Sequence, residues 1–405
     1  MATTFLEFSA TNSIISTQRS TSKRRKCLHL REAAEKEEED HHHQPLLPGL
    51  PDHIAQRCLS LVPPSVLYSV CCSWHRLIYT TSFPPFMSLY ALFESTETLP
   101  QFSNRLRFCS FDPISCKWQN LPPPPPEFSF SFLLRHPSFI SRKFSIQSIA
   151  VSGKLVLLAA TNDQFQPALS GPILFDPLTR NWMRGPSFST PRRWCAMGAS
   201  RAAVFVASGF GSCYNSDVAR SVEKWDLNIR HQKQQQELRR GHQWRWEKMA
   251  NLKDGKFCRE AIDAVGWRGK LCMVNVKGDA AKDGTIYDVE KDSWEDMPKG
   301  MLAGWLGPAA AMDEEIIYAV DETSGSLKRY DHSRDSWVKL MENKMLNGAQ
   351  QIAAAKGKVC VLRADGTGIV VVDVEAPPPC GLWVVDAPPG FHGITMHILP
   401  RLSCS

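Results

Sequence analysis

Cysteine and histidine are the residue types through which this chain could bind a metal ion or carry out redox chemistry. The sequence holds 13 cysteines and 12 histidines. No two cysteines have the C-x-x-C spacing of zinc sites and redox motifs, and Cys71 and Cys72 are adjacent. The triplet His41, His42 and His43 could contact a metal, but the sequence sets no partner ligands with it. We therefore expect reduced thiols, as in cytosol or nucleus, that serve mostly as small core residues.

Nucleophilic catalysis would need a serine, threonine or cysteine beside an activating base. Ser73, His75 and the other candidate side chains show no such arrangement in the sequence. No glycine-rich phosphate-binding loop follows a predicted strand. The sequence therefore predicts neither a catalytic centre nor a cofactor.

Length and composition narrow the class of protein further. The chain has 405 residues, of which 43% are hydrophobic and 22% charged, and its net charge is +6. No run approaches the roughly 20 apolar residues of a membrane span. The charge is too small to indicate nucleic acid by itself. These numbers exclude a secreted disulfide scaffold, a membrane protein, a collagen-like fibre and a wholly disordered chain.

The first 44 residues are expected to be a disordered tail, because few apolar residues recur in them. The basic cluster Lys23–Lys26 could direct nuclear import, and a solvated charged tail is the alternative. The serine-rich start also has a composition typical of a transit peptide. We expect the protein in the nucleus, the cytoplasm or both.

Residues 45–85 form a second region, with apolar residues at helical spacing. Ile54, Ala55, Cys58, Leu59 and Val62 lie on one predicted helical face, and Pro51 suits the first turn of that helix. The prolines at 63 and 64 end it, and Ser65 can cap a second helical stretch. Two or three short helices give a very small core, so this unit is expected to be half of an interface.

Residues 86–405 show almost no helical pattern and many short apolar strands flanked by turn residues. This pattern is typical of an all-β sandwich, barrel or propeller. The predicted strands span 88–93, 106–111, 154–160, 203–207, 270–276, 315–320, 358–362 and 368–374.

An internal repeat favours the propeller. Its unit is an apolar or aromatic residue, then Asp, then usually Trp six positions after the Asp, as in Phe175-Asp176 followed by Trp182. The six Asp residues are 64, 50, 62, 43 and 42 residues apart. A period near 40–50 residues with strand content is the signature of propeller blades. The repeated Asp residues are Asp112, Asp176, Asp226, Asp288, Asp331 and Asp373.

Each repeat predicts the parts of one blade. The apolar strand upstream of the Asp, such as 153–158, is expected to be the inner, buried strand. The Asp is expected to bond the backbone of its own turn, and the Trp to fill the wedge between blades. Six copies predict about six blades, with seven open, and the segment 394–399 could complete a blade across the ring closure.

Two motifs give a resemblance to a known family. Residues 47–80 resemble an F-box, through Leu50-Pro51-Asp52 with Ile54 and the later Cys72-Ser73-Trp74. The repeats resemble degenerate kelch motifs, without their double glycine. Together the chain is similar to the plant F-box/kelch-repeat proteins described as interacting with a Skp-type adaptor. The resemblance implies a kelch-type β-propeller preceded by a small all-α F-box.

The same resemblance implies a function and a contact surface. The chain would be the substrate receptor of an SCF (Skp–cullin–F-box) ubiquitin ligase, which binds a Skp-type adaptor, through it a cullin, and a protein substrate. A propeller scaffold whose F-box acts outside any ligase is the alternative. The residues expected at the adaptor contact or its supporting core are Leu50, Pro51, Ile54, Leu59, Val62, Leu67, Val70, Trp74 and Leu77.

The substrate is expected on the loops that lead into the inner strands. Arg and Trp are the residue types that most often anchor protein interfaces. Packing of the Trp residues between blades and solvation of the Arg residues is the alternative. The candidates are Arg192, Arg193, Trp194, Arg259, Glu260 and Trp305.

A propeller enzyme is the rival class of function. A copper-radical oxidase of the kelch type would need Tyr and His ligands that converge on the axis. The chain has only seven tyrosines, and Tyr287, Tyr318 and Tyr330 already occupy repeat or strand positions. We therefore expect no enzyme.

Overall fold

The structure is a computed structural model in which the chain divides into two units. It describes residues 45–96, 106–125, 132, 145–228, 244–259, 261–277, 282–377 and 380–403. One unit ends at Pro84 and the other begins at Pro85. The predicted tail at 1–44, most of the insertion at 228–241 and Glu260 lie outside the described residues. Within the described ranges, no helix is long and apolar enough to cross a membrane.

The first unit contains three short helices, α2 (Asp52–Leu59), α3 (Pro64–Val70) and α4 (Cys72–Leu77). Pro51 lies at the N-cap of α2, one position before its first turn. Helix α3 begins at Pro64, whose missing N–H and fixed φ suit a first helical position. The prediction that Ser65 caps this helix is therefore wrong, since the N-cap is Pro63.

The core of this unit is small. Its buried side chains include Ala55, Leu59, Leu67, Leu77 and Ile78. The indole nitrogen of Trp74 on α4 donates a 2.8 Å hydrogen bond to the carbonyl oxygen of Leu46, which fixes the segment before α2. Because this core is small, several large apolar side chains of the unit remain exposed to water.

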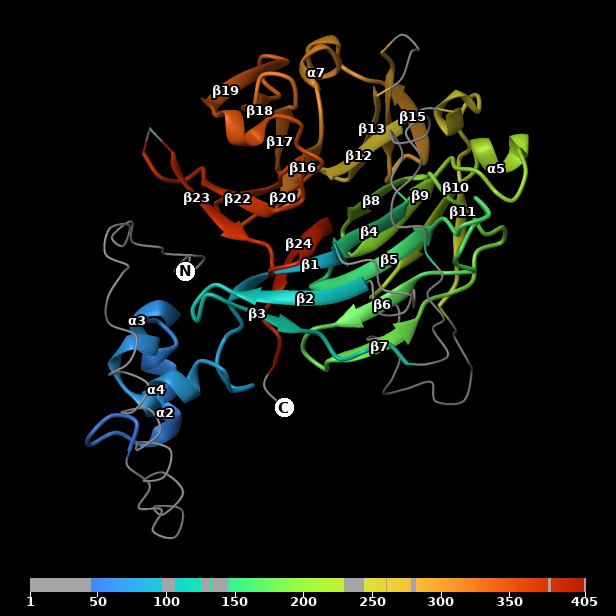
Figure 1. Ribbon diagram of the computed structural model, residues 1–405. Helices are drawn as coiled ribbons and strands as arrows, with labels where there is room; N and C mark the ends of the chain where they lie inside the picture. The colour runs from blue at the N-terminus through green and yellow to red at the C-terminus, as the bar shows by residue number, and fades with distance from the viewer. Residues whose placement is uncertain are drawn as a thin grey trace. The chain divides into compact units, whose positions relative to one another are not determined.

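The second unit is a six-bladed β-propeller, as the repeat predicted (Figure 1). Each blade is an antiparallel sheet of four strands, and the ring closes because the last strand pairs with the first strand of the unit. The first blade contains β24 (Phe391–Pro400), β1 (Met87–Ser95), β2 (Leu106–Asp112) and β3 (Lys117–Asn120). The predicted closing segment 394–399 lies inside β24, and the seven-bladed alternative is excluded.

The other five blades follow in chain order, each beginning with its innermost strand. The second contains β4 (Ile146–Val151), β5 (Lys154–Ala160), β6 (Ile173–Asp176) and β7 (Asn181–Arg184). The third contains β8 (Ala196–Ser200), β9 (Ala203–Ala207), β10 (Val222–Asp226) and β11 (Glu247–Met249). The fourth contains β12 (Ala261–Trp267), β13 (Lys270–Lys277), β14 (Gly284–Asp288) and β15 (Ser293–Asp296). The fifth contains β16 (Ala309–Met312), β17 (Ile316–Asp321), β18 (Ser326–Asp331) and β19 (Ser336–Glu342). The sixth contains β20 (Gln351–Ala355), β21 (Lys358–Leu362), β22 (Gly368–Asp373) and β23 (Gly381–Asp386).

Short helices occupy some connections. They are α5 (Ser216–Arg220), η3 (Lys256–Arg259), α7 (Lys299–Gly304) and η4 (Lys344–Leu346).

The strands predicted to be inner and buried are the second strand of each blade, and they are buried. β5, β9 and their counterparts are apolar because neighbouring strands cover both edges and neighbouring blades cover both faces. The innermost strands β8, β16 and β20 are instead rich in alanine, whereas β4 and β24 also carry larger side chains such as Ile146 and Met396.

The repeated Asp and Trp do what the sequence predicted. Asp176 accepts a hydrogen bond of 2.9 Å from the backbone nitrogen of Leu178 in its own turn. Trp182 donates 2.8 Å to the carbonyl oxygen of Pro122, which follows the last strand of the preceding blade. The same pair of contacts recurs around much of the ring, so each turn is fixed within its blade and each Trp joins two blades. The equivalent Trp contacts are made by Trp118, Trp246, Trp294 and Trp337.

Candidate functional site

The helical unit leaves apolar side chains in water that its own core does not use. Leu50, which precedes α2, and Ile54 on α2 are each 39% exposed. Val70, the last residue of α3, is 53% exposed. Leu61 and Val66, in the turn after α2 and on α3, are exposed as well. Large apolar side chains that remain exposed on so small a unit indicate a partner surface.

The residues predicted for the adaptor contact divide into two groups. Leu50, Pro51, Ile54 and Val70 are exposed, and Val62 and Trp74 are half-buried. The remaining three are buried in the core of the unit and cannot meet a partner in this conformation. Their side chains belong to the supporting core of the unit and not to its surface. These three are Leu59, Leu67 and Leu77.

Two exposed apolar residues were missed by the sequence analysis. Leu61 follows the last turn of α2, and Val66 lies in the first turn of α3. Leu61 lies in the α2–α3 turn, where helical spacing does not apply, whereas the four-residue spacing of Val66 and Val70 on α3 could have identified Val66. Their exposure adds them to the candidate contact surface.

The two ends of the propeller differ in the length of their connections. At one end, two-residue turns such as Ser152-Gly153 and Arg201-Ala202 join the first and second strands of a blade. Both residues of each turn have positive φ, as such hairpin turns require. At the opposite end lie the longer connections, including 208–221 with helix α5. Long connections between rigid strands are where binding surfaces form, so this long-loop end is the candidate partner surface of the propeller.

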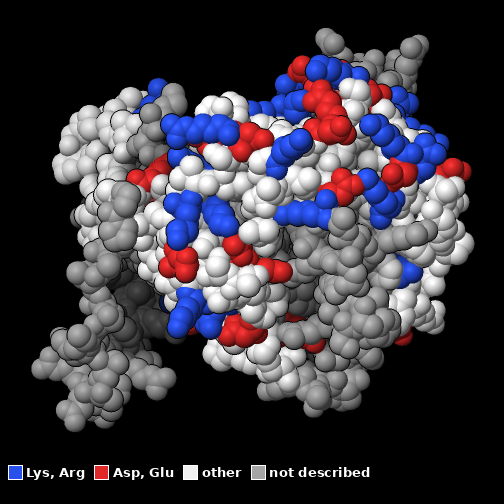
Figure 2. Space-filling view, turned by 90° about the horizontal axis from the view of Figure 1, so that it is seen from above, with Lys and Arg blue, Asp and Glu red and all other residues white. Residues whose placement is uncertain are grey.

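Charge on the propeller is mixed. On the face drawn in Figure 2, Lys and Arg side chains alternate with Asp and Glu instead of gathering into a patch of one sign. Within the propeller, Lys270 lies 2.7 Å from Glu295 and 3.4 Å from Asp288. Hydrogen bonds from Lys270 and from Lys291 lower the pKa of the Glu295 carboxyl. This face lacks the single-sign field that nucleic-acid binding uses.

Arg192 was predicted to bind substrate, and this is wrong. Its side chain is only 1% exposed, and its guanidinium nitrogen Nη2 lies 2.6 Å from Oε2 of Glu223, which is 2% exposed. Ser189 donates a further hydrogen bond to Glu223. Both ions are compensated inside the third blade, so Arg192 is part of the fold.

Arg193 and Trp194 lie at the long-loop end. The Arg193 guanidinium lies 4.0 Å from the centre of the Trp194 ring and 5.4 Å from that of Phe210. Burial lowers the pKa of Arg193, whose Nε and Nη1 find no hydrogen-bond partner in the structure. Trp194 is half-buried and has φ +56°, an uncommon backbone conformation for a bulky residue. Phe210 also contacts the ring of Tyr214, which is exposed.

The other substrate candidates fall elsewhere. Trp305 is completely buried, and its indole nitrogen donates 3.0 Å to Oδ2 of Asp263, so it belongs to the core. Arg259 lies in η3, but its side chain is outside the description, as is all of Glu260. Of the six predicted residues, Trp194 is therefore the one whose described side chain reaches the surface.

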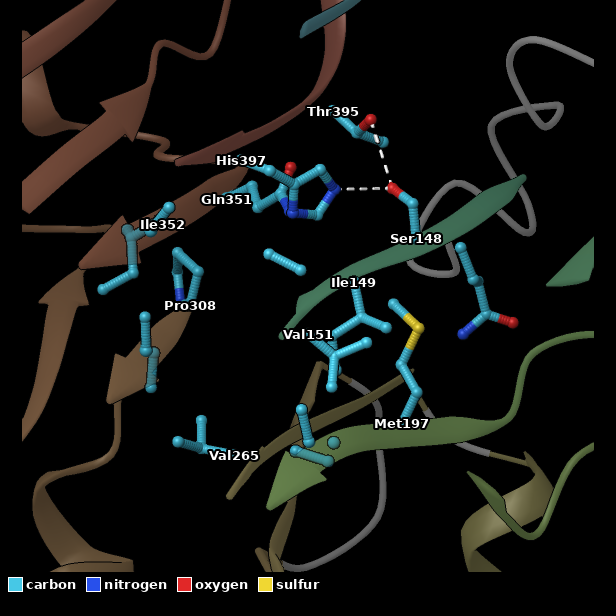
Figure 3. A pocket seen from close by; sticks show the side chains of 18 of the residues that line it. Ser148, Ile149, Val151, Met197, Val265, Pro308, Gln351, Ile352, Thr395 and His397 are labelled. Carbon is cyan, nitrogen blue, oxygen red and sulfur yellow. Dashed lines mark hydrogen bonds between the residues drawn. The ribbon is translucent and has the colours of Figure 1, made fainter. Parts of the chain in front are cut away.

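The axis of the propeller holds a cavity of about 800 Å³. The innermost strands of all six blades line it. Ser148 on β4 and His397 on β24 face each other across the seam between two blades, with 2.8 Å between Oγ and Nε2 (Figure 3). Burial lowers the pKa of His397 to about 4.

The described residues contain no group of three or more His, Cys, Asp or Glu side chains that could hold a metal ion. No disulfide bond is found among their cysteines.

A scan against models of known families found no match. A curated relative, however, covers most of the chain: the F-box/kelch-repeat protein SKIP25 of Arabidopsis thaliana is 50% identical over 365 residues, 88% of this chain and 90% of its own length. The chain belongs to the F-box/kelch-repeat family. The helical unit is thus the F-box, and the six blades are the kelch repeats.

Two more distant relatives agree with this assignment. A second F-box/kelch-repeat protein of Arabidopsis thaliana is 23% identical over 72% of this chain and 70% of its own. The F-box protein AFR of the same plant is 23% identical over 68% of each chain. These names are those of F-box proteins, not of enzymes.

Proposed function

We propose that this F-box/kelch protein is the substrate-recognition subunit of an SCF ubiquitin ligase. The F-box would bind a Skp-type adaptor, which joins it to a cullin, and the long-loop end of the propeller would bind the protein to be ubiquitylated. The observation that carries the proposal is the set of exposed apolar side chains on a helical unit whose own core is small.

The proposed adaptor contact consists of the exposed and half-buried residues of the F-box. Leu50 and Ile54 would enter the adaptor from α2, with Leu61, Val66 and Val70 beside them. Removing such side chains from water stabilises a complex by about 25 cal/mol per Å² of buried apolar area. The buried residues Leu59, Leu67 and Leu77 would hold the helices in the binding arrangement.

The proposed substrate anchor is the cluster of Trp194, Phe210 and Tyr214 around Arg193. Aromatic side chains and Arg carry much of the binding energy of protein interfaces. Arg193 would act chiefly by holding Trp194 in place, since its guanidinium lies against that ring. The chemistry of the substrate itself is left open.

The adaptor contact is tested by Leu50→Ala with Ile54→Ala. Both side chains are already partly in water, so the F-box should stay folded, while affinity for a purified Skp-type adaptor falls by about 10- to 1,000-fold. A matched control is Ile316→Ala with Val338→Ala, because these propeller residues are each 37% exposed. Calorimetric titration of adaptor into each variant measures the difference. Equal affinity of the F-box variant and the wild type would reject the contact.

A scaffold acting outside any ligase is separated from the receptor by two captures. The wild type should recover a cullin together with the adaptor, and the Leu50→Ala, Ile54→Ala variant should recover neither. That variant should still hold its substrate, whereas Trp194→Ala should release it and keep the cullin. Adaptor binding without a cullin would favour the scaffold.

A further inference from the structure

The cavity on the propeller axis has the size and lining of a small-molecule site. Ligand pockets in proteins are typically roughly 300–1,000 Å³ and mostly apolar, with a few polar groups that converge. This cavity encloses about 800 Å³. Its walls are mainly aliphatic, with Ile149, Val151, Met197, Val265 and Ile352 among the side chains around it (Figure 3).

Among the polar residues in this wall, three neutral ones form a hydrogen-bonded cluster. Ser148, Thr395 and His397 line the cavity, and each is at least nine-tenths buried. Oγ of Ser148 lies 2.8 Å from Nε2 of His397 and donates to Oγ1 of Thr395 at 3.3 Å. The three side chains come from β4 and β24, which belong to neighbouring blades.

This arrangement determines which nitrogen of His397 can receive a ligand. A serine hydroxyl has one hydrogen, and that of Ser148 is directed at Thr395. With the Ser148 hydrogen assigned to Thr395, Nε2 carries the imidazole hydrogen and donates it to Ser148, and Nδ1 of the neutral ring is an acceptor. No hydrogen bond to Nδ1 is found among the described residues, although buried polar atoms are normally paired.

The charges around the cavity favour an uncharged ligand. Asp263, Asp313 and Glu314 line it, and none of the described lining residues is Lys or Arg. The carboxylate of Glu314 already accepts hydrogen bonds from Ser200 and the backbone nitrogen of Arg201. The carboxylate of Asp263 accepts hydrogen bonds from Trp305 and the backbone nitrogen of Ala309. An anion would therefore be repelled, and a cation would find no free carboxylate pair to hold it.

We propose that the propeller axis is a binding site for a small uncharged molecule with an aliphatic body and one hydroxyl group. The body occupies the apolar walls, and the hydroxyl donates its hydrogen to Nδ1 of His397. Because His397 and Ser148 stand on different blades, the bound molecule lies at the seam between the first and second blades. Trp194 of the proposed substrate anchor also lines this cavity, so the two sites meet at that residue.

The first test uses 1-decanol and its isomer 1-methoxynonane, which has the same size but no hydroxyl hydrogen. Calorimetric titration into the full chain should show that the alcohol binds about 2- to 12-fold more tightly, as one hydrogen bond contributes. Replacing His397→Phe should abolish this preference while both compounds still bind. If His397 were only structural, His397→Phe would weaken the binding of both compounds equally, and the ratio of their affinities would not change.

The second test asks whether the ligand occupies the axis. Ala353 lines the cavity from β20, and Ala353→Phe should fill part of it and abolish binding of 1-decanol. The smaller Ala353→Leu serves if the first variant does not fold, and it should weaken binding. Sodium decanoate should not bind the wild type. Three outcomes would each overturn the proposal. 1-Decanol fails to bind the wild type, a folded Ala353 variant binds it as tightly as the wild type does, or His397→Phe keeps the preference for the alcohol.

Discussion

The indole nitrogen of Trp118 lies 2.8 Å from the carbonyl oxygen of Asp386, a residue 268 positions away in the sequence. Trp118 stands on β3 and Asp386 ends β23, so the bond joins the first blade of the chain to the last. Four other blades make the same indole-to-carbonyl contact with the blade before them, for example Trp337 with Met301 at 3.0 Å. Ring closure thus repeats the joint used between consecutive blades.

Replacing Trp118→Phe should lower the free energy of unfolding by about 0.5–1.5 kcal/mol, the net contribution of one hydrogen bond. The aromatic ring and most of its packing are kept, so the loss reports the bond. Urea denaturation of the full chain measures it. Trp337→Phe is the matched control, and a loss there with none at Trp118 would show that the closing joint is not formed.

Replacing Arg192→Met should lower the free energy of unfolding by about 3–5 kcal/mol, because it leaves the Glu223 carboxylate buried without its partner. The double change Arg192→Met with Glu223→Leu should recover most of this loss. Urea denaturation of the three proteins gives both values. If Arg192 were instead solvated at the surface, the single change would cost less than about 0.5 kcal/mol.

Leu59 and Leu61 offer a direct comparison of core and surface within the F-box. Leu59 is 2% exposed and Leu61 is 75% exposed. Leu59→Ala should destabilise the F-box by about 2–5 kcal/mol, and Leu61→Ala by less than about 0.5 kcal/mol. Helical circular dichroism of the full chain during heating separates the two. A large loss of helix in Leu61→Ala would mean that this side chain belongs to the core.

The stability of the propeller should fall as the pH drops from about 6.5 toward 4. Burial lowers the pKa of His397 to about 4 from an ordinary value of 6.5, so the unfolded chain takes up the proton first. The contribution is intact above pH 6.5, and roughly 2 kcal/mol of it is lost at pH 5. Urea denaturation at pH 7.5 and 5.0 measures the difference. His397→Gln should remove this part of the pH dependence, and an unchanged slope would assign it to other groups.

Local pattern in the sequence predicted the parts of the propeller that each repeat defines for itself. The Asp–Trp hairpins and the buried second strands recur with every copy, so their spacing was enough. The innermost strands β8, β16 and β20 were missed because they are rich in alanine, which has a low β propensity. Strand β8, which reads Ala-Met-Gly-Ala-Ser, is the clearest example.

Side-chain roles that depend on distant partners could not be predicted in this way. Arg192 was placed in a binding surface because arginine is common there, and its pairing with Glu223 appears only in the folded blade. The Ser148–His397 pair joins residues 249 positions apart and has no spacing signal at all. Among the F-box residues, the sequence could identify apolar faces but not which of the leucines the three-helix core would bury.

The pairing of β1 with β24 has a consequence for synthesis on the ribosome. The hydroxyl of Tyr90 on β1 donates a hydrogen bond to the carbonyl oxygen of Pro400, 310 residues later. One edge of β1 therefore stays unpaired until almost the whole chain has been synthesised. At about 5–20 residues per second, this wait lasts roughly 15–60 s. Throughout that time the nascent protein presents an open strand edge, which is a template for pairing with other chains. Chaperone protection of the unfinished ring is thus a need built into the order of its strands.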